Sequence, residues 1–384
     1  SLTIDPTYAV SGAGDITDAS NNEMSNGETV SGSDGAAPVL LSATYKDTNG
    51  NGTVNRIDAV YSEVITSSTF ESGDWTFPAN PASLSVGSGA FSGSTVQITV
   101  TGAPANTTVL GTTTVKYTNQ GTSNSITDGS NSSATSSVIT VSDETVPILL
   151  SATYKDTNGN GTVDRIDAVY SEVITSSTFE SGDWTFPANP ASLSVGSGAF
   201  SGSTVQITVT GAPANTTVLG TTTVKYTNQG TSNSITDGSN SSATSSVITV
   251  SDEAKPVIVS AVTGDNNSDG TVDRLTLTFS ESVEITDGGS DNDITLAAST
   301  GSASITAGSY GATASTLVYT ISGATAGNTS LTIDPTYAVS GAGDITDPSN
   351  NEMSNGETVS GSDGAAPILL SATYKDTNGN GTVN

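Results

Sequence analysis

Short stretches of alternating apolar and polar residues recur along the whole chain and predict β-strands. The stretches are bounded by Gly, Asn, Pro, Asp or Ser, which are turn residues. No stretch of useful length shows the 3.6-residue period of an amphipathic helix. In the segment 147–255 we therefore predict seven strands, over residues 148–154, 165–173, 183–186, 191–195, 204–210, 221–227 and 246–251.

One face of each predicted strand carries the larger apolar residues and should form the core. A segment of about 110 residues with seven such strands is typical of an immunoglobulin-like β-sandwich. Trp75 and Trp184 lie in the phrase GDWTFPANP; we expect them in the core or against a neighbouring repeat, rather than as a surface for stacking sugars. The predicted core set is Leu150, Ile166, Tyr170, Phe186, Val205, Ile207, Val224, Tyr226, Ile248 and Val250.

The chain is built from internal repeats, each opened by a proline. Pro38, Pro147, Pro256 and Pro367 are separated by 109, 109 and 111 residues. The first two full copies are nearly identical, and the third is divergent. We predict an all-β linear array of tandem immunoglobulin-like sandwiches. The predicted boundaries are 1–37 (the end of a repeat), 38–146, 147–255, 256–366 (three repeats) and 367–384 (the start of a further repeat), so the chain reads as a window of a longer periodic protein.

An oxygen-rich loop comes after the first strand of every copy. The second copy reads DTNGNGTVDRID from Asp156 to Asp167, with oxygen-bearing side chains at positions 1, 3, 5, 9 and 12 and Gly161 at position 6. This is the spacing with which a twelve-residue EF-hand-type loop binds Ca²⁺, position 7 contributing its backbone carbonyl. The candidate ligands are Asp47, Asn49, Asn51, Thr53, Asn55 and Asp58; Asp156, Asn158, Asn160, Thr162, Asp164 and Asp167; Asp265, Asn267, Asp269, Thr271 and Asp273; and Asp376, Asn378, Asn380, Thr382 and Asn384.

The loops depart from an EF-hand at position 12 and in the element next to it. Position 12 is Asp58 or Asp167 instead of Glu, and the adjoining element is a predicted strand instead of a helix. Position 12 is then expected to face the sheet, with an acid from elsewhere completing the ligand set. The alternative is an Asx/Gly-rich turn that holds no metal. The loop should lie ~25–30 Å from the start of its repeat, close to the next or the previous junction. Ca²⁺ is held either within one loop or as a bridge to a neighbouring turn, with Asp128 or Asp237 as donor.

Two phrases resemble a known group of domains. The stretch PVIVSAV…DRLTLTFSESV (256–283) and the phrase YSEV at Tyr61 and Tyr170 resemble bacterial immunoglobulin-like repeats of surface-layer proteins and large adhesins. The loops themselves resemble EF-hand or dockerin loops. The resemblance implies extracellular or cell-surface β-sandwiches stacked in tandem, often with Ca²⁺. It implies no particular ligand and no activity.

The composition of the chain argues against several classes of function. The 384 residues include no Cys and no His, and 38 Asp+Glu against 9 Lys+Arg give a formal charge of −29. Thiolate and imidazole metal sites are thus excluded. The charge argues against nucleic acid as a partner, and no apolar run approaches the ~20 residues of a membrane span. We expect no enzymatic activity and no catalytic residues, because no copy carries a larger pocket-forming segment.

The function predicted from these observations is that of a structural spacer. The segment should serve as a stalk or adhesin spacer of a secreted calcium-binding protein, with neighbouring copies as partners. One alternative is a self-assembling filament or surface-layer subunit, which would form a homopolymer or lattice. Another is a carbohydrate-binding accessory module. Any glycan or host-surface ligand is expected elsewhere in the full protein.

Overall fold

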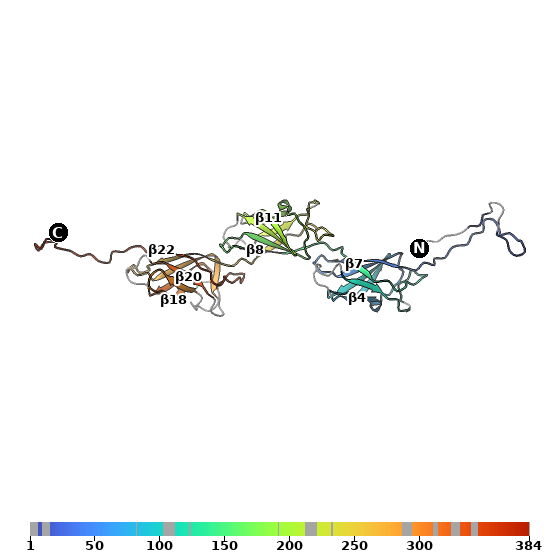
Figure 1. Ribbon diagram of the computed structural model, residues 1–384, viewed down its shortest axis with the longest axis horizontal. Helices are drawn as coiled ribbons and strands as arrows, with labels where there is room; N and C mark the ends of the chain where they lie inside the picture. The colour runs from blue at the N-terminus through green and yellow to red at the C-terminus, as the bar shows by residue number, and fades with distance from the viewer. Residues whose placement is uncertain are drawn as a thin grey trace. The chain divides into compact units, whose positions relative to one another are not determined.

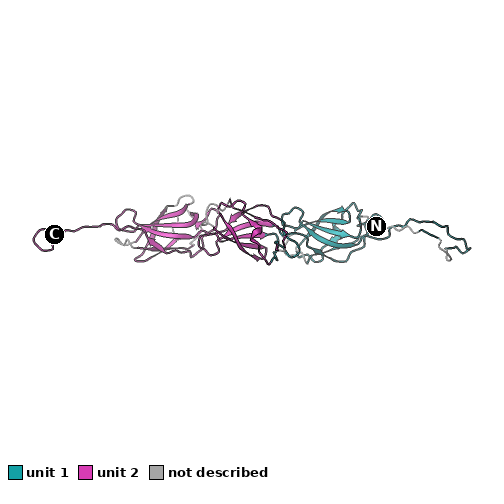
Figure 2. Cartoon of the chain, turned by 90° about the horizontal axis from the view of Figure 1, so that it is seen from above, with its two compact units in different colours: residues 1–148, 170–176, 234–243 teal, residues 149–169, 177–233, 244–384 magenta. Residues whose placement is uncertain are grey.

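The computed structural model (Figure 1) falls into two compact units, coloured separately in Figure 2. Unit 1 comprises residues 1–148, 170–176 and 234–243, and unit 2 comprises residues 149–169, 177–233 and 244–384. Each unit is described by itself. The residues described are 7–9, 16–81, 83–102, 112–122, 124–190, 192–211, 221–231, 233–285, 294–309, 314–323, 331–338 and 345–383.

Seven strands of unit 1 form one continuous ladder in the order β3-β6-β7-β1-β2-β5-β4. The strand β1 is shared, because it pairs antiparallel with β2 on one side and parallel with β7 on the other. It therefore joins the group β1-β2-β5-β4 to the group β7-β6-β3, the strand sets of an immunoglobulin sandwich. The bounds are β1 Leu40–Lys46, β2 Arg56–Tyr61, β3 Trp75–Thr76, β4 Ser85–Ser92, β5 Thr95–Thr101, β6 Thr114–Tyr117 and β7 Ile139–Ser142.

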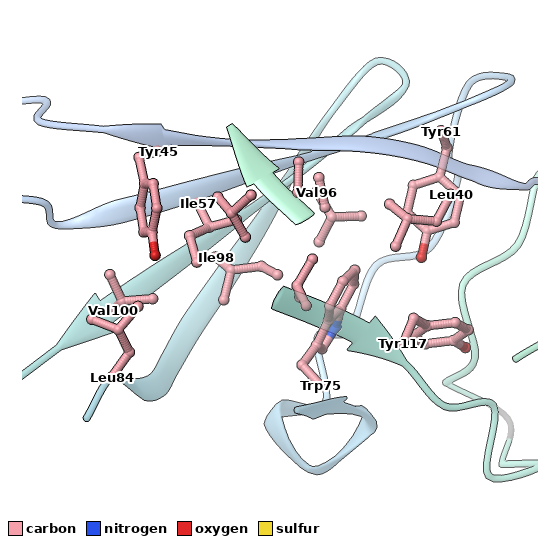
Figure 3. Close-up of a cluster of buried hydrophobic side chains, with 14 of the residues drawn as sticks. Leu40, Tyr45, Ile57, Tyr61, Trp75, Leu84, Val96, Ile98, Val100 and Tyr117 are labelled. Atoms are coloured by element: carbon pink, nitrogen blue, oxygen red, sulfur yellow. The ribbon is translucent and has the colours of Figure 1, made fainter. Parts of the chain in front are cut away.

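The core of unit 1 lies between these two groups of strands. Figure 3 shows Ile57 and Ile98, from β2 and β5, on one side and Trp75 and Tyr117, from β3 and β6, on the other. Trp75 is only 3% exposed, and its ring lies 5.4 Å from that of Tyr117 between centroids. Tyr45 is buried at the far end of β1. The prediction that the tryptophans are core residues is thus confirmed, since Trp184 is equally buried.

Unit 2 holds most of a second ladder with the same order, β10-β13-β14-β8-β9-β12-β11, and a third set of strands. In the third set β15 pairs antiparallel with β16 and parallel with β22, which repeats the shared-strand arrangement. A short ladder of β17 and β20 accompanies it. The bounds are β8 Leu149–Lys155, β9 Arg165–Tyr170, β10 Trp184–Thr185, β11 Ser194–Ser201, β12 Thr204–Thr210, β13 Thr223–Tyr226, β14 Ile248–Asp252, β15 Ile258–Gly264, β16 Arg274–Ile285, β17 Ile294–Ala298, β18 Ser304–Ser309, β19 Ala314–Ser322, β20 Ile333–Tyr337, β21 Ile345–Thr346 and β22 Gly361–Asp363; two 3-10 turns are η1 Ser72–Asp74 and η2 Ser181–Asp183.

The all-β class is confirmed, and the seven predicted strands correspond to β8–β14 with shifted ends. The largest shift is β11, for which the predicted strand lies too early and is too short. Leu150 is predicted to face the core but is 42% exposed, whereas Leu149 is buried. The equivalent strand β1 carries a register shift between Leu40 and Ser42, which moves the alternation by one residue. Phe186 and Ile248 are only half-buried, and the other members of the predicted core are buried.

The domain boundaries proposed from the repeats remain a prediction. The three strand sets match the repeats, but the compact units do not, because unit 1 takes two loops, 170–176 and 234–243, from the second repeat. Among the described residues, no helix is long and apolar enough to cross a membrane.

Candidate metal centre

The side chains of each oxygen-rich loop accept hydrogen bonds from the backbone of the same loop, and these bonds hold the loop in a tight turn. In the second loop the two carboxylate oxygens of Asp156 accept from the backbone N–H groups of Gly159 and Gly161, each at 2.8 Å. Position 5, Asn160, accepts from the N–H of Thr162 at 2.9 Å. Position 9, Asp164, accepts from the backbone and hydroxyl of Thr157 and from the amide of Asn158. Positions 3 and 9 are thus joined through their side chains, while positions 1 and 5 bond to the loop backbone.

The other loops repeat this arrangement. Asp47, Asp265 and Asp376 each accept from the N–H groups of positions 4 and 6 of their own loops. An Asx/Gly-rich turn can form the same bonds without a metal. Asn384 lies outside the described residues. The remaining candidates that accept from their own loops are Asn49, Asn51, Asn55, Asn267, Asp269, Asp273, Asn378 and Asn380, while Thr53, Thr271 and Thr382 donate their N–H to position 5.

The carboxylate at position 12 lies in the strand after the loop. Asp167 forms an ion pair with Arg165 at 2.6 Å, and Asp58 forms one with Arg56 at 2.7 Å. Both aspartates occupy ladder positions, and Asp58 lies opposite Gln97. This agrees with the expectation that position 12 faces the sheet, because strand pairing fixes the direction of its side chain.

The first and second loops each lie beside the linker at the end of their own repeat. In unit 1, Lys46 at the end of β1 forms an ion pair with Glu144 of the linker. In unit 2, Lys155 and Glu253 form the equivalent pair. The cause is the parallel pairing of the first and last strands, β1 with β7 and β8 with β14, which brings their C-terminal ends to one end of the sheet. Of the two predicted positions, beside the next or beside the previous junction, the structure shows the first for these two loops.

The second loop also packs on the first strand of the third repeat. Gly161 has φ +82°, and a Cβ added there would lie 2.9 Å from a methyl group of Val257 and from Cβ of Ser280. Val163, two residues further on, is buried. Position 6 thus needs glycine for two reasons, a left-handed backbone and the close approach of the following repeat.

Replacing Gly161 by alanine should destabilise the chain more than replacing Gly159 does. Gly159 also has a positive φ, +68°, but a Cβ there would meet no atom within 4 Å. Gly159→Ala should therefore cost only the strain of the left-handed backbone, about 1–2 kcal/mol. Gly161→Ala adds overpacking against Val257 and Ser280, typically a further ~1–3 kcal/mol. Denaturant unfolding of the two variants measures the difference, and equal losses would show that the loop does not pack on the next repeat.

Three groups of carboxylates lie where one repeat follows another. In each group an aspartate of the linker, the glutamate of the YSE or FSE phrase and the aspartate of a late turn bring one oxygen each within 4.8 Å of the others. Such groups can hold a metal ion. We call them the first trio (Asp34, Glu63 and Asp128), the second trio (Asp143, Glu172 and Asp237) and the third trio (Asp252, Glu281 and Asp347).

Hydrogen bonds hold the three segments of the third trio in place. Ser280 and Val257 exchange two bonds, one through the Ser280 hydroxyl at 3.0 Å and one between their backbones at 2.9 Å, which fixes the residue before Glu281. Asp347 accepts from the backbone N–H of Asn351 at 2.8 Å, and the Asn351 side chain donates to the backbone carbonyl of Asp252 at 3.2 Å. Asn351 therefore ties the late turn to the linker.

Burial and the charges of neighbouring carboxylates raise the pKa values of two members of the third trio, Glu281 and Asp252. Burial is the main cause that raises the pKa of Glu281 to about 9, and the charges of Asp252, Asp347 and Asp156 add to it. Burial likewise raises the pKa of Asp252 to about 7, with Asp347 contributing. In the second trio the pKa of Glu172 rises to about 9, again mainly through burial and then through Asp143 and Asp237. A cation would relieve this repulsion.

The sequence pattern indicates only part of these trios. Asp128 and Asp237 are predicted as donors to a bridge, and both do lie in trios. The linker aspartates and Glu63, Glu172 and Glu281 are not among the predicted ligands. The sequence does contain a signal that could have identified these residues. Asp34, Asp143 and Asp252 recur at the repeat spacing, as does the glutamate of each YSE or FSE phrase. Only the fold brings these three distant segments to one end of a sandwich.

Comparisons with known proteins identify no family for this chain. No family model and no curated protein matches the chain. The chain is similar to the S-layer protein rSbsC (residues 31–844), with 13% identity, a TM-score of 0.17, and coverage of 88% of this chain but only 55% of that one. It is also similar to a titin fragment of three immunoglobulin domains in an E-to-A mutated variant, with 10% identity, a TM-score of 0.19, and coverage of 86% and 99%. The chain therefore spans about half the length of that S-layer protein, and scores this low carry no argument on function.

Proposed function

We propose that this chain is a structural repeat segment of an extracellular or cell-surface protein, and that Ca²⁺ held by its loops stiffens it. The observation that carries the proposal is the packing of a loop with calcium-type spacing on the following repeat, where Gly161 meets Val257 and Ser280. A cation that orders the loop would also order this contact, because loop and contact share the same backbone. A stalk or adhesin spacer needs such control of the angle between neighbours.

The loops are suited to modest affinity. Their donors are carboxylate and amide oxygens, the ligands that Ca²⁺ prefers, and extracellular modules of this kind bind at roughly 10⁻⁴–10⁻³ M. With position 12 engaged by arginine, the second loop retains two carboxylates, Asp156 and Asp164, and the third loop has three. Additional oxygens must then come from backbone carbonyls, water or a neighbouring segment.

A lateral role as a filament or surface-layer subunit is the second candidate. Apolar side chains are exposed at matching positions of the first two repeats, namely Val138 and Val247 (51% and 50%) and Leu41 and Leu150 (58% and 42%). Exposed apolar residues at equivalent positions of two repeats are suited to contacts between chains. The carbohydrate-binding alternative loses its main support, because both tryptophans are buried. We assign the chain no catalytic role.

Small-angle scattering of the full chain should distinguish these functions. In Ca²⁺ at about 10 mM, well above the dissociation constants usual for extracellular modules, we expect a larger radius of gyration and a larger maximum dimension than in chelator, at unchanged mass. Asp156→Asn should reduce this response, because it removes a carboxylate from one loop, whereas Glu28→Gln removes an exposed charge outside the loops and should not. If Ca²⁺ increases only the mass of the particle, lateral assembly is favoured. If Ca²⁺ changes neither the dimensions nor the mass, the stiffening proposal is contradicted.

A further inference from the structure

The spacing of oxygens in the third trio matches what one Ca²⁺ ion can span. Asp252, Glu281 and Asp347 each offer an oxygen, and these lie within 4.8 Å of one another. Two oxygens on opposite sides of a Ca²⁺ ion, bonded at ~2.4 Å, are about 4.8 Å apart. Three carboxylates supply up to six oxygens, which approaches the roughly 6–8 ligands that Ca²⁺ takes.

A buried carboxylate oxygen without a partner provides an independent indication of a cation. Glu281 is 3% exposed, and its Oε1 atom has no hydrogen-bond partner among the described residues. The same holds for Oε1 of Glu172 in the second trio, a residue that is 1% exposed. A buried acceptor is normally satisfied by a donor, a water molecule or an ion. A carboxylate oxygen facing two further acids is satisfied best by a cation.

The trio is also preformed. Its three members come from the linker, the end of the first hairpin and a late turn, and hydrogen bonds outside the trio hold each segment. Asp252 accepts from the N–H of Ala254 at 2.9 Å, and Asp347 accepts from the N–H of Ser349 at 2.8 Å. A site that is built before the ion arrives does not have to order its ligands on binding.

We propose that Asp252, Glu281 and Asp347 bind one divalent cation of the Ca²⁺ class, at a site separate from the loops. The oxygen-only ligand set selects a hard cation. By the same geometry, the second trio, Asp143, Glu172 and Asp237, is an equivalent site. At the third trio the cation fastens the linker of one repeat to strand β16 and the late turn of the next.

This site is coupled to the loop of the preceding repeat. Asp156, position 1 of the second loop, lies close enough to Glu281 for its charge to act on it, and Gly161 of the same loop contacts Ser280. A cation at the trio would neutralise the negative charge of the carboxylates that lie beside that loop. Binding at the trio should therefore favour loop packing even if the loop itself holds no metal.

Glu281→Gln tests the site, with Glu284→Gln as the matched control. Glu284 is three residues further along the same strand and is exposed. Calorimetric titration of the full chain with Ca²⁺ alone should show that Glu281→Gln removes one binding equivalent or weakens it at least about tenfold. Glu284→Gln should leave the titration unchanged. Asp252→Asn, at the half-buried linker residue of the same trio, provides a second variant with less risk to folding.

The effect of Glu281→Gln on stability should change sign with the metal. In chelator at alkaline pH the variant should melt above the wild type, because it removes a buried charge among acids. In saturating Ca²⁺ it should melt below, because it removes a ligand. A shift of the same sign in both conditions would overturn the proposal. Unchanged Ca²⁺ binding in the variant would overturn it while leaving loop binding intact, whereas no Ca²⁺ binding by the wild type would overturn this site and the proposed function together.

Discussion

Chelation of Ca²⁺ is expected to lower the melting temperature of the full chain, and to do so more strongly at about pH 8 than at about pH 5. A ligand at a hundred times its dissociation constant stabilises the folded state by about 2.7 kcal/mol per site. With affinities near ~10⁻⁴ M, Ca²⁺ at about 10 mM meets this condition. For a domain of about 100 residues the shift is on the order of 10 °C.

The pH dependence arises from the raised pKa of the buried glutamates. The pKa of Glu281 is about 9 in the folded chain against an ordinary value of 4.5. Without metal, the unfolded chain therefore loses this proton at a lower pH than the folded chain does. The free energy of unfolding then falls as pH rises from about 4.5 to about 9, by at most a few kcal/mol per buried glutamate. Bound Ca²⁺ removes this loss, because it stabilises the ionised form.

Differential scanning calorimetry at about pH 5 and about pH 8, with Ca²⁺ and with chelator, measures both effects. Glu281→Gln in chelator is the control, since the melting temperature of this variant should fall less with rising pH than that of the wild type. A melting temperature that rises with pH in chelator would contradict the electrostatic account of the trios. An equal response to Ca²⁺ at both pH values would indicate that the loops alone bind the ion.

Trp184→Ala should cost about 3–5 kcal/mol in the second repeat, the usual range for truncating a buried aromatic residue. Trp184 is 3% exposed, stacks on Phe179 with ring centroids 6.4 Å apart, and lies 5.3 Å from the ring of Tyr226. Truncation would leave a cavity between the rings of Phe179 and Tyr226, and Tyr226 is held in place by strand β13. Trp75→Ala should cost a similar amount, because its surroundings are the same.

Denaturant unfolding measures these losses, and the remaining tryptophan reports on the intact repeat by fluorescence, since the chain has only two. Val247→Ala is the control; Val247 is 50% exposed, so the change should stay within ~0.5 kcal/mol. A loss below about 1 kcal/mol for either tryptophan would mean that its site collapses or was never tightly packed.

The sequence by itself determined the class of the fold, the repeats and the loops. Period-two alternation in β-rich segments reports directly which side chains share a face, so the predicted bounds of β12, Thr204–Thr210, are the observed ones. Loop spacing is equally local, and the Asp and Asn side chains of 156–164 bond to their own backbone as the pattern predicts. The direction of the side chain at position 12 could also be predicted from the sequence, because position 12 lies in the strand after the loop.

Only the tertiary structure decided what depends on pairing between distant segments. The register shift in β1 exposes Leu41, and its counterpart Leu150 is exposed in the same way, which no local alternation reveals. The third trio depends on the pairing of β16 with β21, which brings the strand of Glu281 beside the late turn, and on the bond from Asn351 of that turn to the linker. Burial of Glu281 likewise arises from packing, since neighbouring residues in sequence say nothing about which loop will cover it. The pattern of residues within one segment reflects its local geometry. Contacts between residues about a hundred positions apart in the sequence depend on the order in which the strands pair.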